Sequence, residues 1–188
     1  MQAMLKSVLI VPADTPARVL GACRLRYETF VLEGGDSRYA DHLRKLHIDR
    51  YDVPGPHLWV AEQDGEVVGT LRLVQRSRGP YLGDDCYGWA TLAETLGDSI
   101  DNIQQSAVII SRGAIAKPHR RSGLFSALCN VFEDESRELG AKYILGVVAA
   151  GNDPSFRLLS ERGYFAYHEE TFPSDWKGRC ICKRLNIA

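Results

Sequence analysis

The run Ala107-Val-Ile-Ile-Ser-Arg-Gly-Ala-Ile115, continued by Ala-Lys-Pro-His-Arg-Arg-Ser-Gly-Leu-Phe-Ser-Ala-Leu128, decides the fold. Its β-branched first part predicts a strand over 107–115, and the apolar spacing that follows predicts a helix over 121–139. The first N–H groups of a helix lack intrahelical acceptors and lie at the positive end of its dipole. Gly123 has no Cβ and lets the backbone approach a ligand closely. The join therefore predicts a cradle for an anion such as a pyrophosphate, beside Lys117, Arg120 and Arg121.

Length and composition favour one domain over residues 1–188. The chain is long enough to bury a sizeable core, and its 25% charged and 45% hydrophobic residues are typical of a soluble globular protein. The formal net charge of −1 gives no overall attraction to nucleic acid or to an anionic membrane. The apolar N-terminal run is too short for a signal peptide or a membrane span. We therefore expect a cytoplasmic protein without a membrane span or a nucleic-acid partner.

The cysteines predict free thiols rather than a metal site. Their number is odd and their spacing irregular: Cys23, Cys86, Cys129, Cys180 and Cys182. A metal site would need further ligands at matched spacing, and the sequence offers none. We expect buried or half-buried thiols in a reducing cytoplasm and no bound metal.

Outside the quoted run, strands and helices are predicted without an internal repeat or a linker. A strand over 5–11 stops at Pro12, and Thr15 with Pro16 begins a helix that ends at Glu33. Two β-rich runs around Asp64-Gly65 predict an antiparallel hairpin over 57–74. The remaining segments are predicted as a short helix over 39–46, a loop over 76–88, a helix over 89–103, a strand over 142–149, a helix over 154–162, and strands over 164–169 and 179–186. An α/β domain with a mixed sheet follows.

Two motifs in this order resemble the GNAT acyltransferase superfamily. Arg120-Arg-Ser-Gly123-Leu-Phe125 is similar to the family's Gln/Arg-x-x-Gly-x-Gly/Ala, with Phe125 at the second small position. Asn152-Asp-Pro-Ser-Phe-Arg-Leu-Leu159-Ser-Glu-Arg-Gly163-Tyr164 has the spacing of a second family motif, with Leu159 where relatives carry a tyrosine that protonates the thiolate. The resemblance covers nearly the whole chain. It implies a mixed, mostly antiparallel sheet flanked by helices.

The resemblance also implies a binding site for acyl-CoA or acetyl-CoA as co-substrate. In the family, backbone amides of the first motif hold the pyrophosphate of coenzyme A, and an N–H of the preceding strand polarises the thioester carbonyl. The residues implied here for donor binding are Gly113, Ala114, Ile115, Lys117, Arg120, Arg121, Ser122, Gly123, Leu124, Phe125 and Asn152. Phe125 fits either the helix core or the wall of the donor channel. His119 is expected on the surface beside the cradle.

The N-terminal half resembles one GNAT branch, the acyl-homoserine-lactone synthases and related N-acyl amino acid synthases. Four short patterns of that branch are present: Arg26-x-x-x-Phe30, Asp49-x-x-Asp52, Gly69-x-x-Arg72 and Ser111-Arg112. The resemblance implies catalytic candidates at Arg112, Asp49, Asp52, Arg72 and Arg26. Two positions differ, because Asp36 replaces the branch's tryptophan and Ile109 replaces a glutamate that relatives use as base or acceptor ligand. The second difference argues against S-adenosylmethionine as acceptor.

The charged candidates can be interpreted in two ways. Arg112 lies within an apolar strand, where an unpaired charge costs free energy, so a partner or a ligand is expected. The arginines could bind the carboxylate of an amino-acid-like acceptor, or they could pair with Asp49 and Asp52 to order the N-terminal region. Asp49 and Asp52 fit a surface acidic loop equally well. The nearby acids that could accept the amine's proton are Asp49, Asp52, Glu28 and Glu33.

The first hypothesis is an N-acyltransferase that moves a medium or long acyl group from coenzyme A, or from acyl carrier protein, to a small amine. A short-chain acetyltransferase that uses acetyl-CoA is the alternative enzyme. The third hypothesis is a non-catalytic module that binds acyl thioesters, which the residues at positions 109 and 159 favour. The acceptor is expected to be a small molecule, and the protein a monomer or a homodimer.

Overall fold

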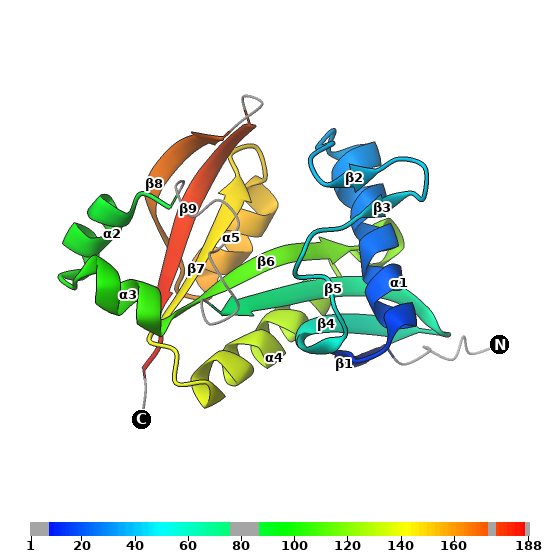
Figure 1. Cartoon of the computed structure of the whole chain (residues 1–188), viewed down its shortest axis with the longest axis horizontal. Coiled ribbons are helices and arrows are strands. Elements are labelled where there is room, and N and C mark those ends of the chain that lie inside the picture. Colours follow the sequence, from blue (N-terminus) through cyan, green and yellow to red (C-terminus); the bar gives the residue numbers. More distant parts are fainter. Residues whose placement is uncertain (1–7, 76–86, 173–175, 187–188) are drawn as a thin grey trace. The chain divides into compact units, whose positions relative to one another are not determined.

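The computed structural model describes residues 8–75, 87–172 and 176–186. Contacts divide the chain into two compact units, which we describe separately (Figure 1). Unit 1 comprises Met1–Arg72 and Arg112–Phe132, and unit 2 comprises Leu73–Ser111 and Glu133–Ala188. The main sheet has the order β1-β4-β5-β6-β7-β9-β8, and β6 pairs with β7 in parallel. The predicted α/β class, with a mixed and mostly antiparallel sheet and flanking helices, is confirmed. The assignment of residues 1–188 to one domain stays a prediction.

The strands of unit 1 bury side chains on both faces. They are β1 (Leu9–Ala13), β4 (Gly55–Gln63), the part of β5 (Glu66–Gln75) up to Arg72, and β6 (Ala107–Ile115) from Arg112. Consecutive side chains of a strand point to opposite faces. Val60 and Val67 accordingly pack in one core cluster with Val19, whereas Ala61 and Val68 pack in another with Leu124. The predicted hairpin is confirmed, and Pro12 is tolerated inside β1 because that strand is an edge.

Helix α1 (Pro16–Arg26) continues directly into a wider π-helical stretch, η1 (Tyr27–Glu33). The side chain of Thr15 accepts a hydrogen bond from the N–H of Arg18, and Pro16 occupies the first turn, as predicted. Figure 1 shows α1 over the strands of unit 1, and a Cβ at Gly21 would lie 2.6 Å from Val67. The close approach places Arg26, at the junction of the two helical stretches, in the interior with no exposed surface.

The predicted helix over 39–46 is wrong. This segment forms a two-stranded antiparallel pair, β2 (Ala40–Asp41) and β3 (Leu46–His47). Tyr39 and Lys45 have positive φ angles of 61° and 54°, which a helix does not accommodate. The carboxylate of Asp41 also accepts the N–H of Arg44, so the chain turns back instead of coiling.

Unit 2 contains the closing strands, β7 (Tyr143–Ala149), β8 (Phe165–Phe172) and β9 (Trp176–Arg184), with helix α5 (Asp153–Glu161). The predicted helix over 89–103 is two helices, α2 (Trp89–Leu96) and α3 (Ile100–Ser106). Gly97 ends the first with a φ of 65°, and Ser99 caps the second by accepting the N–H of Asn102. The predicted loop over 76–88 lies mostly outside the described residues.

Cys23, Cys129, Cys180 and Cys182 are free and buried, as the sequence predicted, and Cys86 lies outside the described residues. Burial raises the pKa of the Cys23 thiol to about 11 and that of Cys182 to about 12, so neither is poised as a nucleophile at neutral pH. Among the described residues, every helix is too short or too polar to span a bilayer.

Candidate functional site

The predicted catalytic candidates meet in one buried cluster in unit 1, which we call the arginine–aspartate cluster: Arg26, Asp49, Asp52, Arg72 and Arg112. α1 supplies Arg26, β5 supplies Arg72, β6 supplies Arg112, and the turn after β3 supplies both aspartates. The carboxylate Oδ1 of Asp52 accepts hydrogen bonds from Arg26 and Arg72, both at 2.8 Å. Its Oδ2 accepts the N–H of Asp49 at 2.8 Å, so the two acids also fix each other's backbone.

Asp49 connects Arg72 to the third arginine, Arg112. Its Oδ1 accepts from Arg72 at 2.7 Å, and its Oδ2 accepts from Arg72 at 2.9 Å and from Nη2 of Arg112 at 2.8 Å. The Nε of Arg112 donates to the same Oδ2 at 3.0 Å. The interpretation of Asp49 as a member of a surface loop is therefore wrong, because its side chain is only 2% exposed.

Among the described residues, the cluster carries a surplus of positive charge, since three guanidinium groups face two carboxylates. Burial alone would raise the pKa of Asp49, but the hydrogen bonds and charges of Arg72 and Arg112 lower it well below its usual range. Burial lowers the pKa of Arg112 even though Asp49 attracts its charge. Arg112 is also the least enclosed member, with 15% of its side chain exposed against 0–2% for the other four. The surplus charge thus lies at the edge of the cluster.

The cradle lies in the same unit, after β6. A short 3₁₀ turn (Lys117–His119) follows the strand, and α4 (Leu124–Glu138) begins three residues later than predicted. The delay has a clear cause, because Arg121 and Gly123 have φ angles of 63° and 83°, outside the helical region. Within the described parts of the chain, the N–H groups of residues 122–126 have no hydrogen-bond acceptor. A Cβ at Gly123 would meet no atom within 4 Å, so the donors border open space.

The side chains around the cradle are mostly exposed. Arg120 donates from Nε to the carbonyl of Ile115 at 3.1 Å and pairs with Glu33 at 2.7 Å. The hydroxyl of Ser122 donates to the carbonyl of His119 at 2.7 Å. The Nε2 of His119 lies 2.7 Å from the side-chain oxygen of Gln63, so this ring is half-buried rather than free at the surface. Lys117, Arg121 and Ser122 remain exposed. The cradle thus combines backbone donors with cationic side chains, which fits a pyrophosphate.

The last residues of β6 lie beneath the first turn of α4. Ala114 is buried, and a Cβ at Gly113 would lie 2.8 Å from the ring of Phe125. Ile115 and the helix residues Leu124 and Leu128 pack around Gly69 and Ala61. Phe125 therefore covers the strand at Gly113, which accounts for a ring at a position where the family motif has a small residue.

The second motif belongs to unit 2, and its residues have structural partners there. The side-chain oxygen of Asn152 accepts the N–H of Ser155 at 3.3 Å and caps α5. Ile109 and Leu159, at the two positions where relatives carry polar groups, are each 4% exposed and belong to the core.

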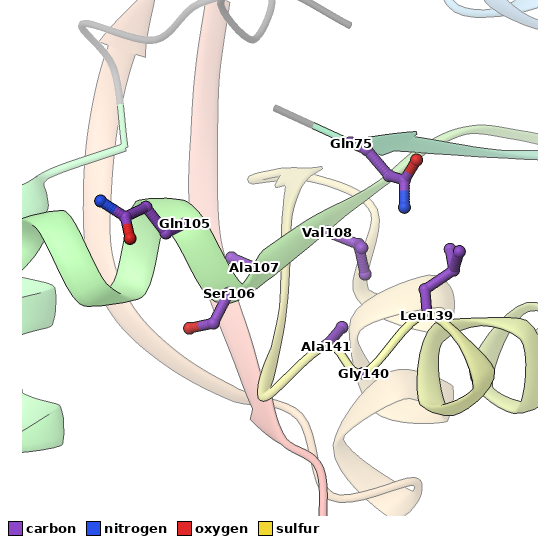
Figure 2. Close-up of a pocket in the computed structure, with 8 residues that line it drawn as sticks. All are labelled: Gln75, Gln105, Ser106, Ala107, Val108, Leu139, Gly140 and Ala141. Carbon is purple, nitrogen blue, oxygen red and sulfur yellow. The ribbon is translucent and has the colours of Figure 1, made fainter. Parts of the chain in front are cut away.

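A shallow pocket of about 110 Å³ opens in unit 2 between the end of β5, the α3–β6 junction and the segment after α4. Figure 2 shows the side chains of Gln75, Val108 and Leu139 facing a common space, whereas Gln105 and Ser106 point away from it. Its lining contains no charged side chain, and the hydroxyl of Ser106 donates to the carbonyl of Asn102. The pocket therefore offers nothing for group-transfer chemistry.

His47 of β3 lies beside the cluster and belongs to none of the motifs found in the sequence. Its ring is fully buried between the rings of Phe30 and Tyr39, at centroid distances of 5.2 and 6.0 Å. Neither ring nitrogen has a hydrogen-bond partner among the described residues. Burial, reinforced by the charges of Arg112 and Arg26, lowers the pKa of His47 to about 4. The ring is therefore neutral at physiological pH.

Residues 25–130 match a family model described as an acetyltransferase (GNAT) domain. The chain belongs to this family. It is therefore an acyltransferase, and the matched segment contains the whole arginine–aspartate cluster and the cradle. GNAT proteins use acetyl-CoA or acyl-CoA, and the cradle's unengaged N–H groups fit such a donor.

Solved structures share the fold at low sequence identity. The AHL synthase LasI superposes with a TM-score of 0.70 at 16% identity, over 96% of this chain and 91% of LasI. Ard1 from Thermoplasma volcanium gives 0.64 at 15% identity, over 95% of this chain and 98% of Ard1. An acyl-CoA N-acyltransferase from Pseudomonas aeruginosa gives 0.63 at 16% identity, over 94% and 98%. No curated protein sequence matches the chain.

Proposed function

We propose that this GNAT enzyme transfers an acyl group from an acyl-CoA to the amine of a small, carboxylate-bearing acceptor. The observation that carries the proposal is the joint presence, in unit 1, of a cradle with unengaged N–H donors and a cluster with surplus positive charge. The first fits the pyrophosphate of the donor, and the second fits an anionic acceptor.

In this proposal the cradle residues bind and orient the donor. The N–H groups of residues 122–126 donate hydrogen bonds to the pyrophosphate oxygens, and the exposed side chains of Lys117 and Arg121 add positive charge. A backbone N–H near Gly113 or Ala114 polarises the thioester carbonyl, a type of interaction whose loss typically lowers rates about 10²–10³-fold. Bound coenzyme A supplies the activated acyl group as a thioester. We also propose that Asn152 contacts the acyl-CoA, in addition to capping α5.

Within the cluster, we assign positioning roles to Asp49, Asp52, Arg26 and Arg72. Both oxygens of Asp49 and the Oδ1 of Asp52 accept hydrogen bonds from arginine side chains. The Oδ1 of Asp49 and the Oδ2 of Asp52 also accept hydrogen bonds from backbone N–H groups. Carboxylates engaged in this way are poor proton acceptors, because protonation would break several charge-assisted bonds. Arg112 is the member left to contact the acceptor.

The resemblance of the N-terminal half to autoinducer and N-acyl amino acid synthases favours a donor acyl chain longer than acetyl. Thermal unfolding with coenzyme A, acetyl-CoA, hexanoyl-CoA and dodecanoyl-CoA tests this. A donor at 100 times its Kd stabilises by about 2.7 kcal/mol, or roughly 5–11 °C in Tm for a chain of this length. With all thioesters at one common concentration, Tm shifts that grow with chain length support the proposal, equal shifts from acetyl upward indicate a short-chain acetyltransferase, and no shift with any thioester contradicts a coenzyme A donor.

A matched pair of glycine variants tests the cradle itself. Gly123 and Gly140 have φ angles of 83° and 69°, and a Cβ at either would meet no atom within 4 Å. Gly123→Ala and Gly140→Ala therefore impose similar backbone strain, but only the first adds a methyl group to the cradle. We expect at least a tenfold higher Kd for coenzyme A in Gly123→Ala and no change in Gly140→Ala, measured by isothermal titration calorimetry. Equal affinities in both variants would remove Gly123 from the donor site.

A further inference from the structure

His47 is a buried polar side chain with unused hydrogen-bonding capacity. A neutral imidazole has one N–H donor and one lone-pair acceptor, and neither has a partner among the described residues. Buried polar groups are rarely left in this condition. The Nη1 of Arg26, another member of the same neighbourhood, is also buried without a partner. Two independent side chains therefore leave donors and an acceptor unused beside the arginine–aspartate cluster.

The partly exposed ring of Tyr39 covers His47. Tyr39 is 45% exposed, its ring meets the His47 ring edge-on at 6.0 Å, and the guanidinium carbon of Arg112 lies 4.8 Å from the Tyr39 ring centroid. Tyr39 and Arg112 both have positive φ angles, 61° and 57°, which are strained for bulky residues. Strained backbone of this kind concentrates at ligand-binding and catalytic positions. The stacked pair is thus held in a costly arrangement on top of His47.

The atoms of Arg112 and His47 that have no hydrogen-bond partner among the described residues indicate what kind of ligand would fit here. Arg112 donates to Asp49 from Nε and Nη2, and Nη1 has no partner among the described residues. Because the cluster has surplus positive charge, and both carboxylates are engaged, it attracts a carboxylate and repels an ammonium group. The lone pair of neutral His47 can still accept a hydrogen bond from an uncharged amine. An amino acid in its free-base form offers this combination.

We propose that Arg112 and His47 form the acceptor subsite, with Tyr39 as its displaceable cover: Arg112 binds the acceptor's carboxylate and His47 accepts a hydrogen bond from its uncharged amine. The proposal rests on the proposed function and specifies the acceptor's chemistry. The subsite selects the nucleophilic form of the amine, because an ammonium group has no free carboxylate to bind. Displacement of Tyr39 opens the way to His47, whose ring is otherwise fully enclosed.

His47→Phe separates this role from a structural one. Phenylalanine fits an aromatic surrounding and removes the unpartnered nitrogens, so its Tm should equal or exceed that of the wild type. The kcat/KM for the acceptor should fall by about 3–10-fold, the effect of one lost hydrogen bond, while the KM for acyl-CoA stays within twofold. His47→Gln retains an acceptor atom and should recover part of the loss. His42→Phe is the control: it removes a hydrogen bond between His42 Nδ1 and the hydroxyl of Tyr27 but leaves His47 in place, so it should lower Tm slightly and leave the kcat/KM for the acceptor unchanged.

The assay follows release of the coenzyme A thiol with the twenty standard L-amino acids, and then with the decarboxylated analogue of each acceptor that is used. A His47→Phe variant that folds and keeps the wild-type kcat/KM for its acceptor overturns the subsite but leaves the proposed function intact. Equal use of an amino acid and its decarboxylated analogue overturns the carboxylate contact with Arg112.

A second readout does not depend on turnover. Ring ¹⁵N NMR signals of His47, assigned with His47→Phe, should shift when an amino acid acceptor is added and stay in place with its decarboxylated analogue. If the wild-type protein neither binds acyl-CoA nor releases thiol, the proposed function fails, and the NMR titration alone then decides the subsite. His47 signals that do not respond to any of the twenty amino acids, with or without coenzyme A, overturn it.

Discussion

Replacing Asp49 by asparagine should strongly destabilise the protein. Asparagine has nearly the same shape, but it carries no charge and turns an NH₂ group toward arginine donors. Asp49 accepts from Arg72 and Arg112 through both oxygens, and its side chain is 2% exposed. Breaking a buried ion pair in this way typically costs about 3–5 kcal/mol, because the partner charge stays buried without compensation. Set against a total stability of about 5–15 kcal/mol, the loss is large.

Urea unfolding at pH 7 measures the loss, and thermal unfolding should show it as a decrease in Tm of roughly 6–20 °C. Asp36→Asn is the matched control, because Asp36 also binds an arginine through both oxygens, Arg38, but the two side chains are 19% and 28% exposed. A pair this close to solvent is worth about 0–1 kcal/mol. Similar losses in the two variants would refute the argument that burial makes the cluster essential.

The stability that Asp49 contributes should also depend on pH, in a direction set by its pKa. The folded-state pKa of Asp49 is lowered, so its contribution to stability is fully present above the unfolded pKa of about 3.9. The contribution is lost as the pH falls through the folded-state value. The difference in unfolding free energy between wild type and Asp49→Asn should therefore be constant from pH 7 to 5 and shrink below about pH 4. A difference that grows on acidification would contradict the direction of this shift.

Two further predictions concern the cradle and the second motif. Gly113→Ala should cost about 1–3 kcal/mol, because its Cβ would lie 2.8 Å from the Phe125 ring, and adding Phe125→Leu should restore part of the stability in thermal unfolding. Asn152→Ala should lower the unfolding free energy by about 1 kcal/mol through loss of the α5 cap. Asn152→Ser retains a capping oxygen, so it should keep that stability yet bind coenzyme A more weakly in calorimetry, and unchanged affinity in both variants would remove Asn152 from the donor site.

Local chemistry made much of the fold predictable. The β-branched run gave β6 its observed bounds, Ala107–Ile115, and the Thr15-Pro16 pair marked the start of α1. These features depend on residues close in sequence. The five residues of the cluster were predicted from the resemblance to known synthases. A partner for Arg112 was also predicted from physical chemistry, because an unpaired charge inside an apolar strand costs free energy.

The parts that were missed depend on backbone conformations that residue type does not favour, or on packing between distant segments. Residues 39–46 have helical spacing, but the left-handed backbone at Tyr39 and Lys45 produces a strand pair. His47 follows no motif, and its burial results from Phe30 on η1 and Tyr39 before β2. The late start of α4 depends on the φ of Arg121, a non-glycine residue in a conformation that sequence does not announce. Tertiary packing accounts for the burial of His47, whereas the other two differences follow from left-handed backbone at non-glycine residues.

The composition of the cluster is itself an argument for function. Buried ion pairs are weak stabilisers, since well-packed apolar residues of similar volume are often as good or better. Among the described residues, the cluster holds three arginines against two aspartates, so burial leaves one guanidinium without its own carboxylate. The extra guanidinium belongs to the member nearest solvent, on the strand that leads into the cradle. In the proposed function, Arg26, Arg72 and the aspartates hold Arg112 in place, and its Nη1, which has no partner among the described residues, contacts the carboxylate of the acceptor.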